Sequence, residues 1–145
     1  MSRWGVELEG AEFVRSTLTD LMPKEARNIA RRAVVAVARQ VRDTARGNAP
    51  KDSGTLRKAI RSKRSKGGMD QANAEVSVTK GATARHDAWY WHIIEFGSKK
   101  QAAQPYIQPT LAEWRTKAPR VFGREWWSQF SKEMEKRAKK QRGAR

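Results

Sequence analysis

Residues 23–46 read PKEARNIARRAVVAVARQVRDTAR, and this stretch decides the fold. Apolar residues recur at every third or fourth position from Ala26 to Ala45, while arginines occupy much of the opposite surface. This spacing predicts a long amphipathic helix. Gly47 and Pro50 should end it, because glycine favours the position after a helix and proline cannot continue one. The apolar stripe is rich in alanine and valine, so a sheet of the same chain or a neighbouring subunit can approach it closely.

The segments that follow predict a small antiparallel sheet. Residues 52–56 are expected to form a turn that leads into a short helix, with Asp52 or Ser53 as its N-cap. Residues 61–66 are expected to form an exposed strand or arm, and residues 74–80 alternate apolar and polar side chains as a half-buried strand does. Aromatic and β-branched residues favour another strand at 89–96, although their spacing also fits a helical turn.

Prolines divide the rest of the sequence into segments. Residues 105–109 are expected to be extended, because a residue before proline avoids helical geometry. Pro109 then opens a helix that Pro119 and Gly123 interrupt, and residues 126–141 form a second helical stretch. The predicted fold is α+β, with a long N-terminal amphipathic helix packed on a small antiparallel β-sheet and a C-terminal helical segment. We expect a single domain over residues 1–145, made of a lead-in strand or arm (1–10), a core (11–115) and a C-terminal helical extension with a basic tail (116–145).

The composition excludes several classes of protein. Lysines and arginines number 31 against 15 acidic residues, which gives a formal net charge of +16. Hydrophobic residues make up 38% of the chain, enough for one modest core. The absence of cysteine excludes disulfide scaffolds, thiolate zinc sites and cysteine catalysis. No apolar run is long enough to cross a bilayer, and the first residues lack the apolar region of a secretory signal, so synthesis in the cytosol is expected.

Polar residues that could support catalysis gather in one place only. His86, Asp87, His92 and Glu95 form this set, and the last two lie three residues apart, as metal ligands on one helical face can. Their spacing matches no known metal motif, and the chain has neither a phosphate-binding glycine loop nor a nucleophile turn. Loop surface and ordinary polar positions explain them more simply. We therefore expect no enzyme, metal or cofactor, and a metal-dependent nuclease is the weakest alternative.

Two basic runs, residues 57–66 and 137–145, contain no acidic residue. Such a density of cations attracts a polyanion, which makes a small basic nucleic-acid-binding protein the main alternative function. A solvated edge strand is the simpler explanation of the first run, since positive charge discourages edge-to-edge aggregation. The residues that could touch DNA or an acidic partner there are Arg57, Lys58, Arg61, Lys63, Arg64 and Lys66.

The pair Trp126 and Trp127 stands out in the C-terminal stretch. Neighbouring residues on a helix point in different directions, so both indole rings cannot enter one small core. One ring is expected to face either a partner subunit or the N-terminal helix, and tryptophan is common at the centre of interfaces.

Three segments in this order resemble the small neck proteins of long-tailed bacteriophages, also called tail-completion or head–tail joining proteins. They are APKDSGTL at 49–56, residues 89–98 ending in IEFGS, and QPYIQPTL at 104–111. The motif positions are Pro50, Ser53, Gly54, Leu56, Glu95, Phe96, Gly97, Pro105, Tyr106 and Pro109. The family usually has threonine where this chain has Ser53 and phenylalanine where it has Tyr106. Both differences keep the hydroxyl or the ring, and residues 116–145 lie outside the resemblance.

The resemblance implies a non-enzymatic virion protein of the neck or tail, located in the host cytoplasm during assembly. Such proteins form a homo-oligomeric ring, commonly of six copies, between the head connector and the tail. The implied partners are copies of itself, the connector or head-completion protein, and the tail tube or tail terminator. Double-stranded DNA passes through the ring without base-specific contact, and no membrane is involved. The polar loop that contains Lys99 and Lys100 could become ordered when it docks on the next ring.

Overall fold

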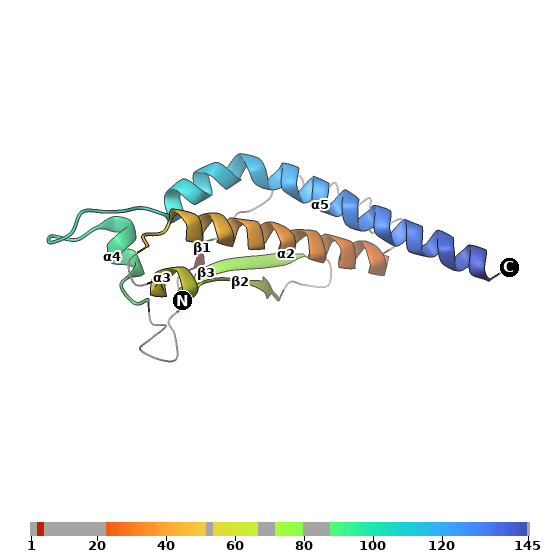
Figure 1. The fold of residues 1–145 in the computed structure, drawn as a ribbon, viewed down its shortest axis with the longest axis horizontal. Helices are drawn as coiled ribbons and strands as arrows, with labels where there is room; N and C mark the ends of the chain where they lie inside the picture. Colours follow the sequence, from red (N-terminus) through yellow and green to blue (C-terminus); the bar gives the residue numbers. More distant parts are fainter. Residues whose placement is uncertain (1–2, 5–22, 52–53, 67–71, 80–87, 145) are drawn as a thin grey trace.

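The computed structural model describes residues 3–4, 23–51, 54–66, 72–79 and 88–144. Helix α2, Pro23–Asn48, confirms the long amphipathic helix predicted from the sequence. Its stripe is buried at the expected spacing, because Ala33 and Ala45 are fully covered and Ile29, Val37 and Val41 are nearly so. The small side chains let both a sheet and a second long helix, α5 (Ile107–Gly143), pack against α2 (Figure 1).

The sheet has three antiparallel strands in the order β1-β3-β2, which are Arg3–Trp4, Asn73–Val78 and Ile60–Ser65. The predicted exposed strand is β2, and the predicted half-buried strand is β3. In β3 the alternation fails at Ser77, which is only 1% exposed, so both sheet faces are covered at that position. Short helix α3, Thr55–Ala59, follows Gly54 as predicted, while the expected caps Asp52 and Ser53 lie outside the described residues.

Residues 89–96 do not form a strand. The segment contains helix α4, Trp91–Phe96, and the backbone N–H of Ile94 donates to the carbonyl of Tyr90. The helical spacing therefore prevails over strand propensity, because it places Tyr90, Trp91 and Ile94 together against the core. Gly97 ends the helix, as predicted.

Helix α5, Ile107–Gly143, corrects the prediction for the C-terminal third. Residues 105–109 are not an extended segment, because the helix already includes Gln108 and Pro109. A proline is tolerated there because the N–H groups of a first helical turn have no partner within the helix. Pro119 and Gly123 do not separate two helices either. The helix continues through them with a bend along its length (Figure 1), which is the usual consequence of an internal proline.

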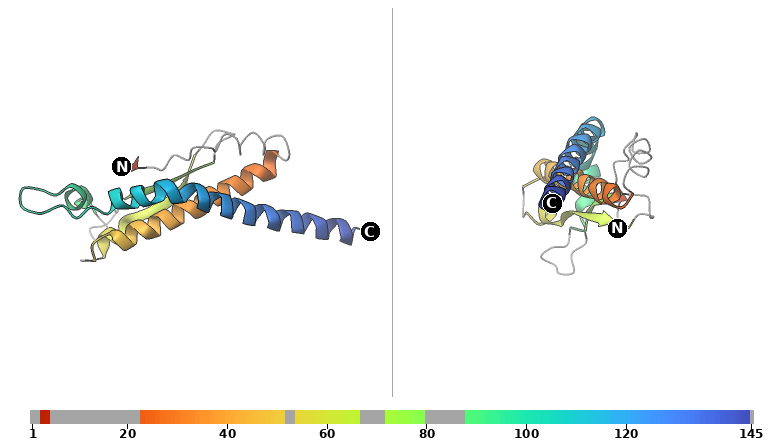
Figure 2. Two further views of the ribbon diagram at one scale, coloured as in Figure 1. Left: turned by 90° about the horizontal axis from the view of Figure 1, so that it is seen from above. Right: turned by 90° about the vertical axis from the view of Figure 1, so that its right-hand side faces the viewer.

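Helices α2 and α5 run in opposite directions and cross, and the end of α5 extends past the start of α2 (Figure 2). The core between them and the sheet includes Leu56, Ile60, Val76, Val78 and Trp114. The architecture is thus α+β, as the sequence predicted. None of the described helices is long and apolar enough to cross a membrane.

Candidate functional site

The start of α5 is held by the carboxylate of Glu95, which belongs to α4. One oxygen, Oε2, accepts the backbone N–H groups of Tyr106 at 2.7 Å and Ile107 at 2.9 Å. The other oxygen, Oε1, accepts that of Gln108 at 2.9 Å. Glu95 is 2% exposed, and its negative charge lies at the positive end of the helix dipole. A single buried side chain therefore caps a helix that begins twelve residues later, and it joins the second sequence motif to the third.

The loop between α4 and α5 is compact. The Gln104 N–H donates to the Ile94 carbonyl at 2.8 Å, and Ser98 and Gln101 pair through their backbones. Gly97 adopts φ +76°, and a Cβ there would lie 2.9 Å from the backbone nitrogen of Ala103. Only glycine fits this position, which explains its place in the motif. The interface candidates Lys99 and Lys100 lie exposed on this loop.

Polar side chains also join the start of α5 to the end of α2. The Asn48 amide donates to the Thr110 hydroxyl at 3.0 Å, and that hydroxyl donates to the Tyr106 carbonyl at 2.7 Å. The Trp114 indole donates to the Thr44 hydroxyl at 2.9 Å. Helices α2, α4 and α5 therefore meet in one rigid junction.

Tyr106 lies fully buried inside this junction. Its hydroxyl has no hydrogen-bond partner within the described part of the chain. Burial, with the nearby Glu95 carboxylate and Tyr90, raises the pKa of Tyr106 well above its ordinary range. The ring therefore fills space, and the hydroxyl adds nothing that phenylalanine would lack.

The first motif closes the same, C-terminal end of α2. Arg57 donates to the Ala49 carbonyl from Nε at 3.1 Å and from Nη2 at 2.8 Å, so its guanidinium binds the chain itself just past the helix. Gly54 adopts φ +72°, and Leu56 is buried. Pro50 is half-buried, and Pro105 and Pro109 are exposed at the junction.

Five of the six cations proposed for DNA contact remain exposed: Lys58, Arg61, Lys63, Arg64 and Lys66. Arg61 and Lys63 point to one face of β2, because side chains alternate along a strand. Arg46 of α2 reaches the same strand and donates to the Ile60 carbonyl at 2.7 Å and 3.0 Å. Burial lowers the pKa of Arg46, and the positive charge of nearby Arg42 is the second cause. The side of α2 that faces β2 is therefore also positively charged.

Large apolar side chains remain exposed on two helices. Trp89 and Phe96 at the two ends of the α4 segment are 56% and 65% exposed, and Trp127 and Met134 on α5 are 63% and 43% exposed. The interface candidate Trp126 is half-buried and stacks on Phe130 with ring centroids 5.2 Å apart. The two neighbouring tryptophans do point to different surroundings.

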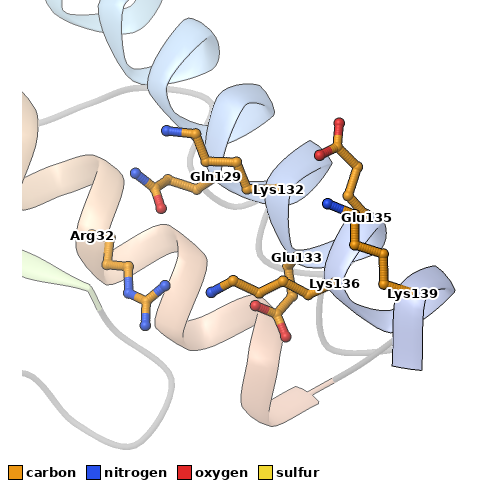
Figure 3. Close-up of a pocket in the computed structure, with 7 residues that line it drawn as sticks. All are labelled: Arg32, Gln129, Lys132, Glu133, Glu135, Lys136 and Lys139. Atoms are coloured by element: carbon orange, nitrogen blue, oxygen red, sulfur yellow. The ribbon is translucent and has the colours of Figure 1, made fainter. Parts of the chain in front are cut away.

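A charged groove of about 260 Å³ separates the far half of α5 from α2 (Figure 3). Near its end, Arg137 of α5 pairs with Glu25 of α2 at 3.0 Å. Both side chains are partly exposed, so this pair adds at most about 1 kcal/mol. The groove is lined by Arg32, Gln129, Lys132, Glu133, Glu135, Lys136 and Lys139.

The four residues considered for metal chemistry do not form a site in the described structure. Glu95 is occupied by three backbone N–H groups, and His92 is exposed on α4. His86 and Asp87 lie outside the described residues, and no metal-ligating trio occurs within the described ranges. Glu95 therefore has a structural role at the junction, as the cap of α5.

Sequence reasoning placed Glu95, Gly97 and Tyr106 in motifs but missed the bonds that connect them. The acceptors and donors are largely backbone groups, which leave no trace in the sequence. It also missed Asn48 and Thr44, for which the only signals were a polar residue at a helix end and one within an amphipathic helix, and it gave Thr110 of the third motif no role of its own.

Exposed aromatic side chains beside a rigid helix-capped junction, as the described residues show here, are typical of proteins that bind other proteins. The comparison with protein families is more specific: residues 14–97 match the family described as "Bacteriophage HK97-gp10, putative tail-component". The chain belongs to this family of phage tail components, and its place is in the virion. No curated protein and no solved structure gave a match.

Proposed function

We propose that this protein is a non-enzymatic neck or tail-completion component that assembles as a homo-oligomeric ring between the head connector and the tail. The observation that carries the proposal is the family match, which spans the first two motifs and ends at Gly97. The third motif lies beyond the match, and the Glu95 cap connects it to the matched part. Residues 1–145 then form one domain, in which the far half of α5 is an assembly arm.

The junction suits such a role because a ring needs subunits with a fixed shape. Glu95, Gly97 and the polar ties to α2 define the angle at which α5 leaves the core. The exposed loop with Lys99 and Lys100 can then contact a neighbouring molecule of the assembly, because its charges attract acidic partner surfaces.

The net charge of +16 agrees with DNA passing through the ring. Exposed cations along β2 would neutralise phosphates without reading bases, so the duplex is held and can still slide. Binding by this route is non-specific and falls steeply with salt. In this proposal DNA contact is part of the ring's task, and a free nucleic-acid-binding protein is the alternative.

Assembly of particles tests the proposed function. Heads and tails are prepared without this chain, mixed with or without the purified protein, and scored by electron microscopy for joined particles. We expect joining only when the protein is added. A matched control adds the Glu95→Ala variant, whose junction is uncapped and which should restore joining poorly. Normal joining without the protein would reject the role.

A further inference from the structure

Two helices of this chain expose apolar faces that the core does not use. The first, here called the α4 face, consists of Trp89, Ile93 and Phe96, which follow one another at spacings of four and three residues. Trp89 and Phe96 are more than half exposed, while Tyr90, Trp91 and Ile94 on the other side of α4 pack against the core. An aromatic face of this kind on a charged protein marks a contact with another molecule.

The second, here called the α5 face, consists of Trp127, Ser131, Met134 and Ala138. Their spacings of four, three and four residues place them along one side of the helix. All except the half-buried Ser131 are exposed. The side of α5 turned to α2 is charged instead and lines the groove with Lys136 and Glu133 (Figure 3). The far half of α5 therefore presents its apolar side outward, the reverse of a helix that belongs to the core.

The two faces cannot meet within one chain. Helix α4 lies at one end of the molecule, and the far half of α5 extends toward the other end in both views (Figures 1 and 2). If one face covers the other, the contact must join two copies head to tail. A contact of this type between unlike surfaces continues from copy to copy and closes into a ring when the rotation permits.

Each face has a tryptophan followed seven residues later by a second large apolar side chain, and the two faces carry one pair of opposite charges. Trp89 lies in the turn just before α4, whereas Trp127 and Met134 span about 10 Å of α5. If the two faces run in the same direction, Lys99 and Lys100, which follow Phe96 by three and four residues on a loop, lie at the end of the contact where Glu135 follows Met134. Glu135 is among the residues that line the groove, but its side chain points away from Arg32 (Figure 3), and it forms no ion pair within the described residues. The exposed charges of residues 88–106 are the two lysines, since the only acid there is the buried Glu95.

We propose that the α4 face of one copy docks on the α5 face of the next, with Lys99 and Lys100 facing Glu135. The inference rests on the proposed ring and names the surface that builds it. Trp127 is the anchor of the α5 face, because exposed tryptophans that become covered contribute most of the binding energy of many interfaces.

Two single variants and their mixture test this arrangement by sedimentation velocity over a concentration series. Phe96→Asp damages the α4 face, and Trp127→Asp damages the α5 face. Each alone should weaken self-association at least about 30-fold. A mixture of the two should form dimers with the wild-type affinity, because one intact face remains on each partner. Thr116→Asp, at an exposed position nearer the start of α5, is the matched control and should assemble as the wild type does.

The outcomes separate the interface from the ring. If the wild type assembles and both variants do so equally well, or if their mixture stays monomeric, the assignment of these faces is wrong while the proposed ring stands. If Phe96→Asp alone still forms dimers, the α5 faces pair with each other and the head-to-tail contact is refuted. A wild type that stays monomeric and binds only another virion protein overturns both the inference and the homo-oligomeric ring.

The charge pairing has its own test. Glu135→Lys should weaken assembly, and adding Lys99→Glu and Lys100→Glu to that variant should restore it, because the opposite charges are exchanged. If the exchanged charges weaken assembly further instead of restoring it, the predicted register of the two faces is wrong.

Discussion

Replacement of Glu95 by alanine removes the acceptor for three backbone N–H groups at the start of α5. Tyr106 and Ile107 are 0% and 5% exposed, so their N–H groups stay buried without a partner. Gln108 is exposed, and its N–H can bind water. Each buried donor left unpaired costs about 1–3 kcal/mol. Glu95→Ala should therefore lower the free energy of unfolding by about 2–6 kcal/mol, a large part of the stability of a domain of this size.

Glu95→Gln keeps one carbonyl oxygen and loses the charge. The remaining carbonyl oxygen can still accept a hydrogen bond from the buried N–H groups. The side-chain NH₂ group, however, faces an N–H donor where the second carboxylate oxygen was. We expect about half the loss caused by alanine. Urea unfolding followed by circular dichroism measures the free energy of unfolding of both variants. Its dependence on urea concentration should stay unchanged if the transition remains two-state.

Hydrogen exchange adds a local measurement to this experiment. The amides of Tyr106 and Ile107 should lose protection in Glu95→Gln before those in the middle of α2 do. The matched control is Glu113→Gln, an exposed partner of Lys117 on α5, which should change stability by less than about 0.5 kcal/mol. If Glu95→Gln is as stable as the control and its amides stay protected, the cap does not hold the junction together.

Three other changes follow from the same structure. Tyr106→Phe should leave stability near neutral pH unchanged or raise it by about 1 kcal/mol, because the lost hydroxyl has no partner. The pKa of this tyrosine is raised in the folded state, so above about pH 10 the unfolded state loses the proton more readily and the wild type loses stability. The variant should lose less stability over this range in pH-dependent unfolding, and equal losses would contradict this. Gly97→Ala should destabilise the chain well beyond Gly54→Ala in urea unfolding, because both have positive φ but only Gly97 would bring a Cβ to 2.9 Å from Ala103; the reverse ranking would refute it. Charge reversal along β2 should reduce the slope of log K for DNA binding against log salt concentration by up to about 2.7, because three phosphate contacts are lost. A filter-binding titration measures this slope, and an unchanged slope would show that β2 does not contact DNA. The reversed residues are Arg61, Lys63 and Arg64.

The parts of the fold set by side-chain periodicity could be predicted from the sequence. Helix α2 follows from its apolar stripe, and β3 from its alternation except at Ser77. Residues 89–96 could not be assigned by propensity alone, because tryptophan and isoleucine favour strands. The decision depends on which side chains reach the core, and Tyr90 and Ile94 do so one helical turn apart.

The errors in α5 have a common physical cause. Pro109 and Pro119 were treated as boundaries from their local geometry, whereas tertiary contacts compensate for both. Glu95 accepts the N–H groups before Pro109, and Ala118 beside Pro119 is fully buried in the core. Neither contact has a signal in the local sequence. The candidate site was therefore predicted as three separate motifs, and the bonds that unite them came only from the structure.

Electron cryo-microscopy of purified virions, with averaging of the neck region, tests the central claim most directly. The account predicts a closed ring of this chain between connector and tail, with α4 of each copy seated on α5 of its neighbour around a channel as wide as DNA. A well-resolved neck that contains no copy of this chain, or copies that touch only other proteins, would contradict it.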